Sequence, residues 1–304
     1  MLKTKSALIS LMLSSKFWMI KDYANGFMAD VFFNIAEDYT EIPTYQEESV
    51  EFVKSCGALS LTTHFYENDI PENSIAFHRI HGIILADESW RYFSSKQFKR
   101  DLIAADNNPN INAHFISVKS GGGEAWFLDV VNNTVKNLKK PSVFHIEKVA
   151  ASAAIYLSVN GTKIFSATPN EIIGSIGSMV SFWDITGYYE SLGLKHVEEY
   201  ATQSDLKNKK YNDLRKGETK QYIKEELDPL AAQFIAAVKE GRPKTASLEE
   251  KHPLFRGETF LTQEAHTLGL IDGQMLMEDA ILEAEKLGKS WKDEQSKLNK
   301  IFNL

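Results

Sequence analysis

The chain has 304 residues, of which 43% are hydrophobic and 25% charged, and it carries a formal net charge of −7 at neutral pH. This length provides one large domain or two modest ones with an ample core, and the composition is that of an ordinary soluble globular protein. The acidic balance argues against a dedicated nucleic-acid-binding protein, because neutralising phosphates requires a basic face.

The N-terminal part of the chain raises the question of targeting. The apolar stretch 7–13 has seven residues and is followed by Lys16 without a small-residue cleavage site, whereas a membrane span needs about 20 apolar residues. We predict an amphipathic helix leading into KFWMI (16–20), with a weak signal peptide as the minor alternative and no membrane anchor. The one cysteine, Cys56, cannot form an intrachain disulfide, which suits a reducing compartment such as the cytoplasm.

Strands and helices are expected to alternate from residue 73 onward. The pattern of apolar residues predicts strands over 73–85, 111–123, 142–150, 163–169 and 195–201. It predicts helices over 94–110, 124–140, 152–160 and 188–194, a lysine-rich loop running into a long helix over 205–242, and an amphipathic helix at the C-terminus. The stretch 171–182 is expected to open with turn glycines and to end as a strand. This alternation predicts βαβ units, and therefore an α/β fold with a mostly parallel sheet and flanking helices.

Three consecutive glycines lie in KSGGGE (119–124), where a predicted strand meets a predicted helix. Glycine allows a sharp turn, and N–H groups at a helix start favour negative charge. A phosphate cradle is one interpretation, but the Lys-Ser/Thr ending of a P-loop and the spacing of a dinucleotide-binding fingerprint are both missing. A tight strand-to-helix turn without a ligand is an equally good interpretation.

Ser152 also follows a predicted strand and precedes a predicted helix, and two alanines flank it on each side. Open α/β sheets bind ligands at this carboxyl edge, and the small neighbours would let a substrate backbone approach. Ser152 is therefore a candidate nucleophile, with an oxyanion hole formed by N–H groups of Ala153 and of Gly122 or Gly123. The alternative is a serine that only caps the helix, which contributes about 1 kcal/mol.

A serine nucleophile needs a group that takes its proton. His145 and His196 lie in predicted strands without an obvious carboxylate to orient them, so a Ser-His-Asp triad is poorly supported. A lysine can serve instead if its surroundings lower the pKa of the amine from about 10.4 to about 7. The polar loop after the last predicted strand offers Lys207, Lys209 and Lys210. Spacing alone does not choose among them, and a solvated surface charge is the simpler interpretation for each.

Several motifs within residues 75–274 resemble, in the same order, the signal peptide peptidase A family of serine proteases. RIHGIIL (79–85) resembles the family's first core strand, KSGGGE its Ser-Pro-Gly-Gly turn, and the segment 150–180 its nucleophile region. FIAAVKEGR (234–242) and LTQEAHTLGLID (261–272) resemble its late helix and its closing Gly-Leu-Ile/Val-Asp. The resemblance implies a Ser-Lys dyad on a Clp-protease/crotonase-like fold, with no metal or cofactor.

By this resemblance Ser152 is the nucleophile, Lys207 is the general base, and Ser175 hydrogen-bonds the lysine. The sequence departs from the family's pattern in three places: Gly121 replaces the proline of the turn, Ala153 and Ala154 replace two glycines after the nucleophile, and Ser204 replaces a glycine of the lysine segment.

The resemblance also suggests a subfamily and a domain plan. We interpret residues 1–70 as a helical or irregular extension, 71–275 as the peptidase domain and 276–304 as an amphipathic C-terminal helix. Phage and prophage capsid-assembly (head maturation) proteases of the family often begin with a short helix and a Trp-Ile-like segment, which KFWMI resembles. This implies a protein substrate such as a capsid or scaffold protein. It also implies a homo-oligomer in which neighbouring subunits line the substrate groove.

Two alternatives remain open. One is a catalytically degenerate capsid-assembly or scaffold protein of the same fold. The other is a crotonase-like acyl-CoA enzyme, which shares the fold but does not explain Ser152 and Lys207 together.

Overall fold

A single sheet organises the molecule. The computed structural model describes residues 17–19, 50–54, 59–62, 65, 70–88, 92–182, 184 and 186–302. The strands among these residues are β1 (Phe17–Met19), β2 (Val50–Val53), β3 (Leu59–Thr62), β4 (Ser74–Leu85), β5 (Phe93–Ser94), β6 (Ile111–Glu124), β7 (Ser142–Ala151), β8 (Lys163–Ser166), β9 (Ile172–Gly174), β10 (Thr259–Phe260) and β11 (Gly273–Gln274).

The helices connect these strands or follow them. The α-helices of the described residues are α3 (Ser95–Asn107), α4 (Leu128–Lys136), α5 (Ala153–Ser158), α6 (Thr186–Ser191), α7 (Lys209–Arg215), α8 (Lys220–Tyr222), α9 (Asp228–Gly241), α10 (Thr262–Leu268) and α11 (Met277–Phe302). Shorter helical turns are η1 (Thr202–Ser204), η2 (Ile223–Leu227, a π-helical turn), η3 (Pro243–Ser247) and η4 (Pro253–Arg256).

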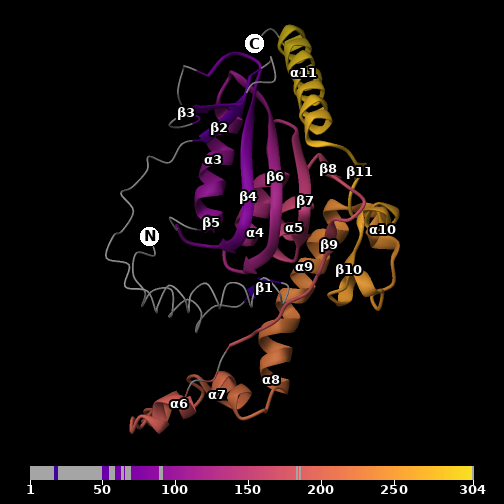
Figure 1. Ribbon diagram of the computed structural model, residues 1–304. Helices are drawn as coiled ribbons and strands as arrows, with labels where there is room; N and C mark the ends of the chain where they lie inside the picture. The colour runs from indigo at the N-terminus through magenta and orange to yellow at the C-terminus, as the bar shows by residue number, and fades with distance from the viewer. Residues whose placement is uncertain are drawn as a thin grey trace.

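The main path of the sheet runs β10-β9-β7-β6-β4-β2-β3 (Figure 1). The central strands β4, β6, β7 and β9 are parallel, and β8 adds to β7 in the same direction. Antiparallel pairing occurs between β2 and its neighbours, between β9 and β10, and between the short β1 and the end of β6. The predicted α/β fold with a mostly parallel sheet and flanking helices is confirmed. Because neighbouring parallel strands end at the same edge, the residues that follow β6, β7 and β9 lie close together.

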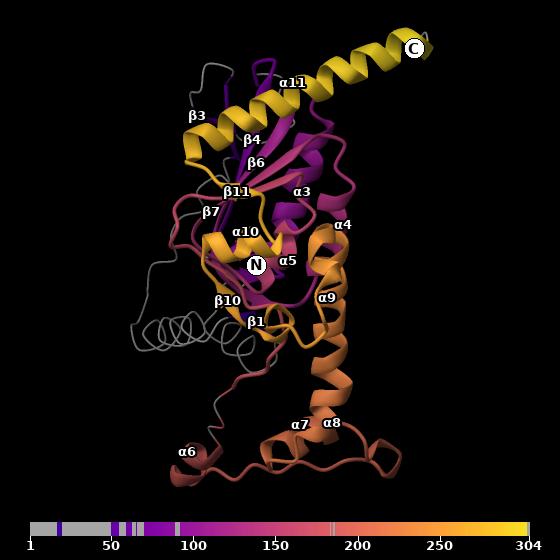
Figure 2. The ribbon, with the colours of Figure 1, turned by 90° about the vertical axis from the view of Figure 1, so that its right-hand side faces the viewer.

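Each face of the sheet is buried by its own helices. One face packs against α3, α4, α5 and α9 through an apolar cluster that includes Ile80, Val118 and Phe234. The other face packs against the first part of α11 through Ala280 and Ala284, while the rest of that helix extends beyond the sheet (Figure 2). Because both faces are covered, nearly every residue of β6 and β7 is buried, including polar ones such as His114 and His145.

Three sequence-based expectations about local structure are wrong. Residues 195–201 form no strand. The stretch 171–182 begins with strand β9 and continues as irregular chain, which reverses the expected order. The glycines of KSGGGE form no strand-to-helix turn, because β6 continues through them to Glu124 and α4 starts only at Leu128. Pairing with neighbouring strands therefore overrides the turn preference of three consecutive glycines.

An arm, defined here as residues 178–227, projects away from the sheet in both views (Figures 1 and 2). An irregular chain leads out to α6, η1 and α7, and α8 with η2 leads back into α9. At the base of the arm the Ser178 hydroxyl donates a hydrogen bond of 2.6 Å to the Leu227 carbonyl. The apolar side chains that the arm exposes are Tyr188, Tyr189, Leu192, Leu194, Val197, Leu206 and Ile223. Such a concentration of exposed apolar groups marks an interaction surface.

Several expectations for the N-terminal part concern residues outside those described, among them the helix over 7–13 and Cys56. Within the described part, β2 and β3 precede residue 71 and yet pair into the sheet beside β4. The division at residues 70 and 275 remains a proposal. None of the described helices combines the length and the apolar character that crossing a bilayer requires.

Two buried histidines lie near the start of the central strands. His78 Nε2 is 3.1 Å from His114 Nδ1, and His114 Nε2 is 3.4 Å from Asp106 Oδ1. Burial lowers the pKa of both rings, and the neighbouring His114 adds to the effect on His78. The Asp106 hydrogen bond opposes the decrease at His114 without cancelling it. Both histidines are therefore neutral in the folded protein at neutral pH.

Acidification is expected to destabilise the fold through this pair. Because the folded-state pKa lies below the unfolded value of about 6.5, the stabilisation is complete above pH 6.5 and is lost as the pH falls through the folded-state value. The melting temperature should therefore fall by several degrees between about pH 7.5 and pH 5. A His78→Phe variant should show a smaller dependence, and His266→Gln, an exposed change on α10, should follow the wild type. Equal pH dependence in all three proteins would contradict the assignment.

A buried ion pair joins the closing motif of the chain to α9. Arg242, which follows α9 and is 8% exposed, places one guanidinium nitrogen 3.0 Å from Asp272 Oδ2 and donates another hydrogen bond of 3.0 Å to the Gly161 carbonyl. Asp272 also accepts a hydrogen bond of 2.8 Å from the Ile164 N–H in β8. The aspartate of the Gly-Leu-Ile-Asp sequence therefore has a structural role.

Removing the arginine should be costly, because it leaves the Asp272 carboxylate without its buried partner. We expect Arg242→Leu to reduce the free energy of unfolding by about 2–3 kcal/mol, the usual range for lost hydrogen bonds of a charged group, measured by urea denaturation. Lys163→Leu is the matched control, because its side chain is 40% exposed and its amine lies 3.5 Å from the same carboxylate, and an exposed pair contributes about 1 kcal/mol or less. Equal losses in the two variants would contradict this role for Arg242.

Candidate active site

Ser152 occupies the sharp turn between β7 and α5. The strand ends at Ala151, the helix begins at Ala153, and Ser152 has φ 55° and ψ −120°. A positive φ in a residue with a side chain costs about 1–3 kcal/mol and persists only where the surroundings enforce it. A strained strand-to-helix turn of this kind presents a serine hydroxyl at the end of a sheet in many hydrolases.

Ser152 does not act as a helix cap. Its side chain makes no capping hydrogen bond, although it stands at the N-cap position of α5 and is only 2% exposed. Its backbone is held in place by an N–H bond of 2.8 Å to the Gly174 carbonyl and by a carbonyl that accepts from Tyr156 N–H at 3.0 Å. The capping interpretation is therefore wrong, and the hydroxyl is free of that local partner.

The alanines around Ser152 serve the packing of the turn. Ala150, Ala151, Ala153 and Ala154 are all fully buried. They do not line an open surface, so the expectation that their small size admits a substrate backbone is not supported. Larger side chains at these positions would push the turn away from the sheet, which explains the run of small residues.

Ser175 lies beside Ser152 on the neighbouring strand. It follows β9, whose Gly174 is paired with Ala151 of β7, so the two serines leave adjacent parallel strands at the same level. Ser175 also has φ 55°, and its N–H donates a hydrogen bond of 2.8 Å to the Glu258 carbonyl. The structure therefore brings together two of the three residues assigned to catalysis from the sequence.

The candidate oxyanion donors differ in their availability. The Gly122 N–H already donates to the Ser120 hydroxyl at 3.1 Å, and that hydroxyl donates in turn to the Gly82 carbonyl at 2.5 Å. Gly123 is tightly packed, because a Cβ at this position would lie 2.0 Å from the Ile84 carbonyl oxygen. The Ala153 N–H opens α5 and therefore has no acceptor within the helix. Sequence reasoning missed Ser120, since nothing in its spacing indicates that it occupies the Gly122 donor.

The three candidate lysines lie on the arm. Lys207 is exposed in the turn before α7, and it has no ion pair or side-chain hydrogen bond with any described residue. Lys209 and Lys210 are paired instead with Asp213 and Glu226, and these hydrogen bonds raise the pKa of both amines. No lysine among the described residues forms a hydrogen bond with Ser152 or Ser175 in this single chain.

One lysine does have the lowered pKa that a base requires, but it is in the wrong place. Burial lowers the pKa of Lys140 to about 8, and its amine donates to the Ala105 and Asn108 carbonyls. Lys140 precedes β7 and Ser152 follows it, so the ten-residue strand separates them by roughly 30 Å.

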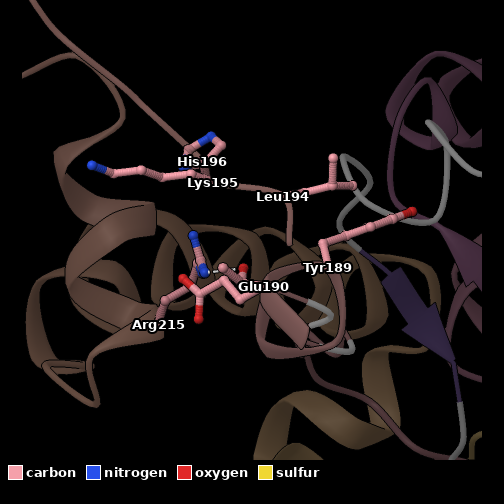
Figure 3. Close-up of a pocket in the computed structure, with 7 residues that line it drawn as sticks. Tyr189, Glu190, Leu194, Lys195, His196 and Arg215 are labelled. Atoms are coloured by element: carbon pink, nitrogen blue, oxygen red, sulfur yellow. Dashed lines mark hydrogen bonds between the residues drawn. The ribbon is translucent and has the colours of Figure 1, made fainter. Parts of the chain in front are cut away.

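The histidines of the sequence analysis are also separate from Ser152. His145 is buried, and its Nε2 lies 2.9 Å from the Met275 carbonyl, to which it donates. His196 is on the arm, where it helps to line a pocket of about 280 Å³. Figure 3 shows Lys195 and His196 on one side of this pocket and Glu190 and Arg215 on the other. Within the described residues, no three His, Cys, Asp or Glu side chains cluster in a way that could hold a metal ion.

Comparison with known proteins now identifies the family. The model of "Peptidase family S49" matches residues 134–290, more than half of the 304 residues, and this stretch contains both Ser152 and Ser175. The chain belongs to peptidase family S49. The predicted signal peptide peptidase A-like relationship is confirmed at this level, while a special closeness to phage proteases remains a proposal.

A curated relative supports the same assignment. Protease 4 of Haemophilus influenzae is 25% identical over 219 residues, which cover 71% of this chain. These residues make up 35% of Protease 4, so the S49 chain spans about a third of the length of this relative.

Solved structures similar to this S49 chain include a protease and acyl-CoA enzymes. One is the 1510-N membrane protease specific for a stomatin homolog from Pyrococcus horikoshii, with 17% identity, coverage of 69% of this chain and 77% of that one, and a TM-score of 0.40. Another is a putative enoyl-CoA hydratase/carnithine racemase from Magnetospirillum magneticum AMB-1, with 16% identity, coverage of 64% and 65%, and a TM-score of 0.35.

Proposed function

We infer that this S49 chain is a serine endopeptidase that uses Ser152 as the nucleophile and Lys207 as the general base. The observation that carries the inference is the conformation of Ser152, a strained and uncapped serine at the carboxyl edge of the sheet in a chain of a peptidase family. Strain of this kind gathers at functional sites, and its ψ of −120° places Ser152 outside the left-handed region that Phe127 occupies with φ 68° and ψ 0°.

Peptide hydrolysis would proceed in two steps. The Ser152 hydroxyl attacks the carbonyl carbon and gives its proton to the Lys207 amine, and the lysine then protonates the leaving nitrogen as the C–N bond breaks. The oxyanion is held by the Ala153 N–H and by the backbone of the glycine strand at Gly123. Water then releases the acyl group from Ser152. Ser175, adjacent to Ser152, would orient the lysine.

Lys207 would come from a neighbouring subunit. In the single chain this lysine lies on the projecting arm, and the arm exposes seven large apolar side chains that an isolated protein would not leave in water. Docking of the arm onto the Ser152 edge of another copy would bury these side chains. It would also remove the lysine from water, and desolvation is what lowers the pKa of an amine toward the range of a base. The predicted homo-oligomer is in this way part of the catalytic proposal.

The physiological role that we propose is cleavage of capsid or scaffold proteins during phage or prophage head maturation, in the host cytoplasm. Its support is the resemblance of the N-terminal KFWMI segment to those proteases. Incubation of the pure protein with the products of neighbouring genes, followed by mass spectrometry of new protein termini, tests this role. Specific cleavage of a capsid or scaffold protein supports it, and cleavage confined to unrelated proteins refutes it.

A catalytically degenerate assembly protein is the second candidate. It is favoured by the exposed position of Lys207 and by the departures from the family pattern at Gly121 and Ser204. Labelling with a fluorophosphonate distinguishes the two functions, because only an activated serine reacts. Labelling of the wild type but not of Ser152→Ala supports the peptidase, and equal labelling of the two proteins removes Ser152 from the mechanism.

A further inference from the structure

A short N-terminal strand lies on the glycine strand of the candidate active site. β1 pairs antiparallel with the end of β6, with Phe17 opposite Glu124, Trp18 opposite Gly123 and Met19 opposite Gly122. The proposed mechanism assigns no role to this segment. Its position next to a proposed oxyanion glycine therefore requires an explanation.

β1 occupies the edge of β6 that lies next to Ser152. The other edge is taken by β4, whose Ile83 and Ile84 pair with Gly122 and Gly123. The pairing of β6 with β7 ends at Ser120 and Ala150, because β7 turns into α5 at Ser152. Beyond Ser120, β6 continues to Glu124 without pairing to β7, and β1 pairs with this edge of β6 instead.

The direction of β1 is the one that a substrate requires. Phe17 is opposite Glu124 and Met19 is opposite Gly122, so β1 runs along β6 in the direction of Ser120. Ser120 is paired with Ala150, and Ala150 lies two residues before Ser152. A peptide attacked by Ser152 must present the carbonyl at the end of such a strand, with the preceding residues held by backbone hydrogen bonds. An added strand of this kind is a common way of binding extended peptides.

We propose that the first substrate of this protease is its own N-terminal segment, held as β1 and cleaved by Ser152 at the peptide bond that follows Met19. This proposal rests on the proposed function. Ser152 Oγ bonds to the carbonyl carbon as its proton passes to the general base, and the C–N bond breaks as the protonated base gives that proton to the new amino terminus. Water then hydrolyses the ester, so that no co-reactant besides water is needed. Until this cleavage occurs, β1 occupies the edge of β6 with which another peptide would have to pair.

The test follows the intact mass and the N-terminal sequence of the full-length protein during incubation. The wild type should lose its N-terminal residues up to Met19, and full-length Ser152→Ala should keep them. Hydrolysis of labelled casein should start after a lag that matches this cleavage. Two proline variants test the strand, Trp18→Pro and the double variant Phe17→Pro/Met19→Pro, because proline removes the N–H donors that pair with β6. Both variants are needed, because only every second residue of β1 directs its N–H group toward β6.

The outcomes separate this inference from the proposed function. A proline variant that hydrolyses casein without a lag but keeps its N-terminus supports the proposal, and its activity shows that it is folded. Casein hydrolysis by a wild type that stays intact, or is cut elsewhere, overturns self-cleavage and leaves the peptidase in place. Cleavage of both types of proline variant at the wild-type rate overturns the role of β1. Absence of all cleavage in every protein refutes the proposed function itself.

Discussion

Ser152→Ala is expected to abolish peptide hydrolysis, with a loss of activity of at least about a thousandfold. The reason is that no other hydroxyl can take over the bond to the substrate carbonyl from the turn between β7 and α5. The fold should survive, since the Ser152 side chain makes no capping hydrogen bond and alanine has the same backbone requirements at φ 55°. The stability change should therefore stay within about 1 kcal/mol. Casein hydrolysis and thermal unfolding, measured on the same preparations, check both parts.

Ser158→Ala is the matched control for this experiment. Ser158 is a fully buried serine at the end of the same helix, and its hydroxyl donates to the Ala154 carbonyl at 2.7 Å. This variant loses one hydrogen bond, which costs about 1 kcal/mol, and should keep its activity. If Ser152→Ala retained hydrolysis while remaining folded, Ser152 could not be the nucleophile.

Lys207→Ala should reduce activity by about a hundred- to ten-thousandfold, the usual contribution of a general acid–base. Lys209→Ala and Lys210→Ala should have much smaller effects, because both amines are bound to carboxylates of the arm. The critical experiment mixes the inactive Ser152→Ala and Lys207→Ala proteins after dissociation and reassembly. If the lysine acts on the serine of a neighbour, a mixed assembly contains intact pairs of one Ser152 and one Lys207, and part of the activity returns.

The mixing experiment has a built-in control. Reassembly of either variant with itself cannot form such a pair and should stay inactive. Activity that does not return in the mixed sample, although light scattering shows mixed oligomers, would show that any dyad forms within one chain. A fully active Lys207→Ala protein would instead show that Lys207 is not the general base and that another lysine has this role.

Some parts of the site were predictable from the sequence because they depend on local chain geometry. Ser152 follows a run of apolar residues and precedes a helix, and this local pattern is enough to place it at the carboxyl edge of a parallel sheet. Ser175 is one strand further along the same edge, and both serines have φ 55°. The sequence of glycines at 121–123 was misleading, because their conformation depends on pairing with β4 and β1, which lie far away in the chain.

The sequence by itself determined the alternation of strands and helices, the α/β fold, and the candidate nucleophile, since each follows from residue spacing and local backbone preference. Tertiary structure alone decided where the partners of Ser152 are. It placed Lys207 on a distant arm, left the Ser152 hydroxyl uncapped, occupied the Gly122 N–H with Ser120, and laid the chain's own β1 along the glycine strand. The physical reason is that these relationships join segments far apart in sequence, whose contacts depend on how the sheet packs and not on any local pattern.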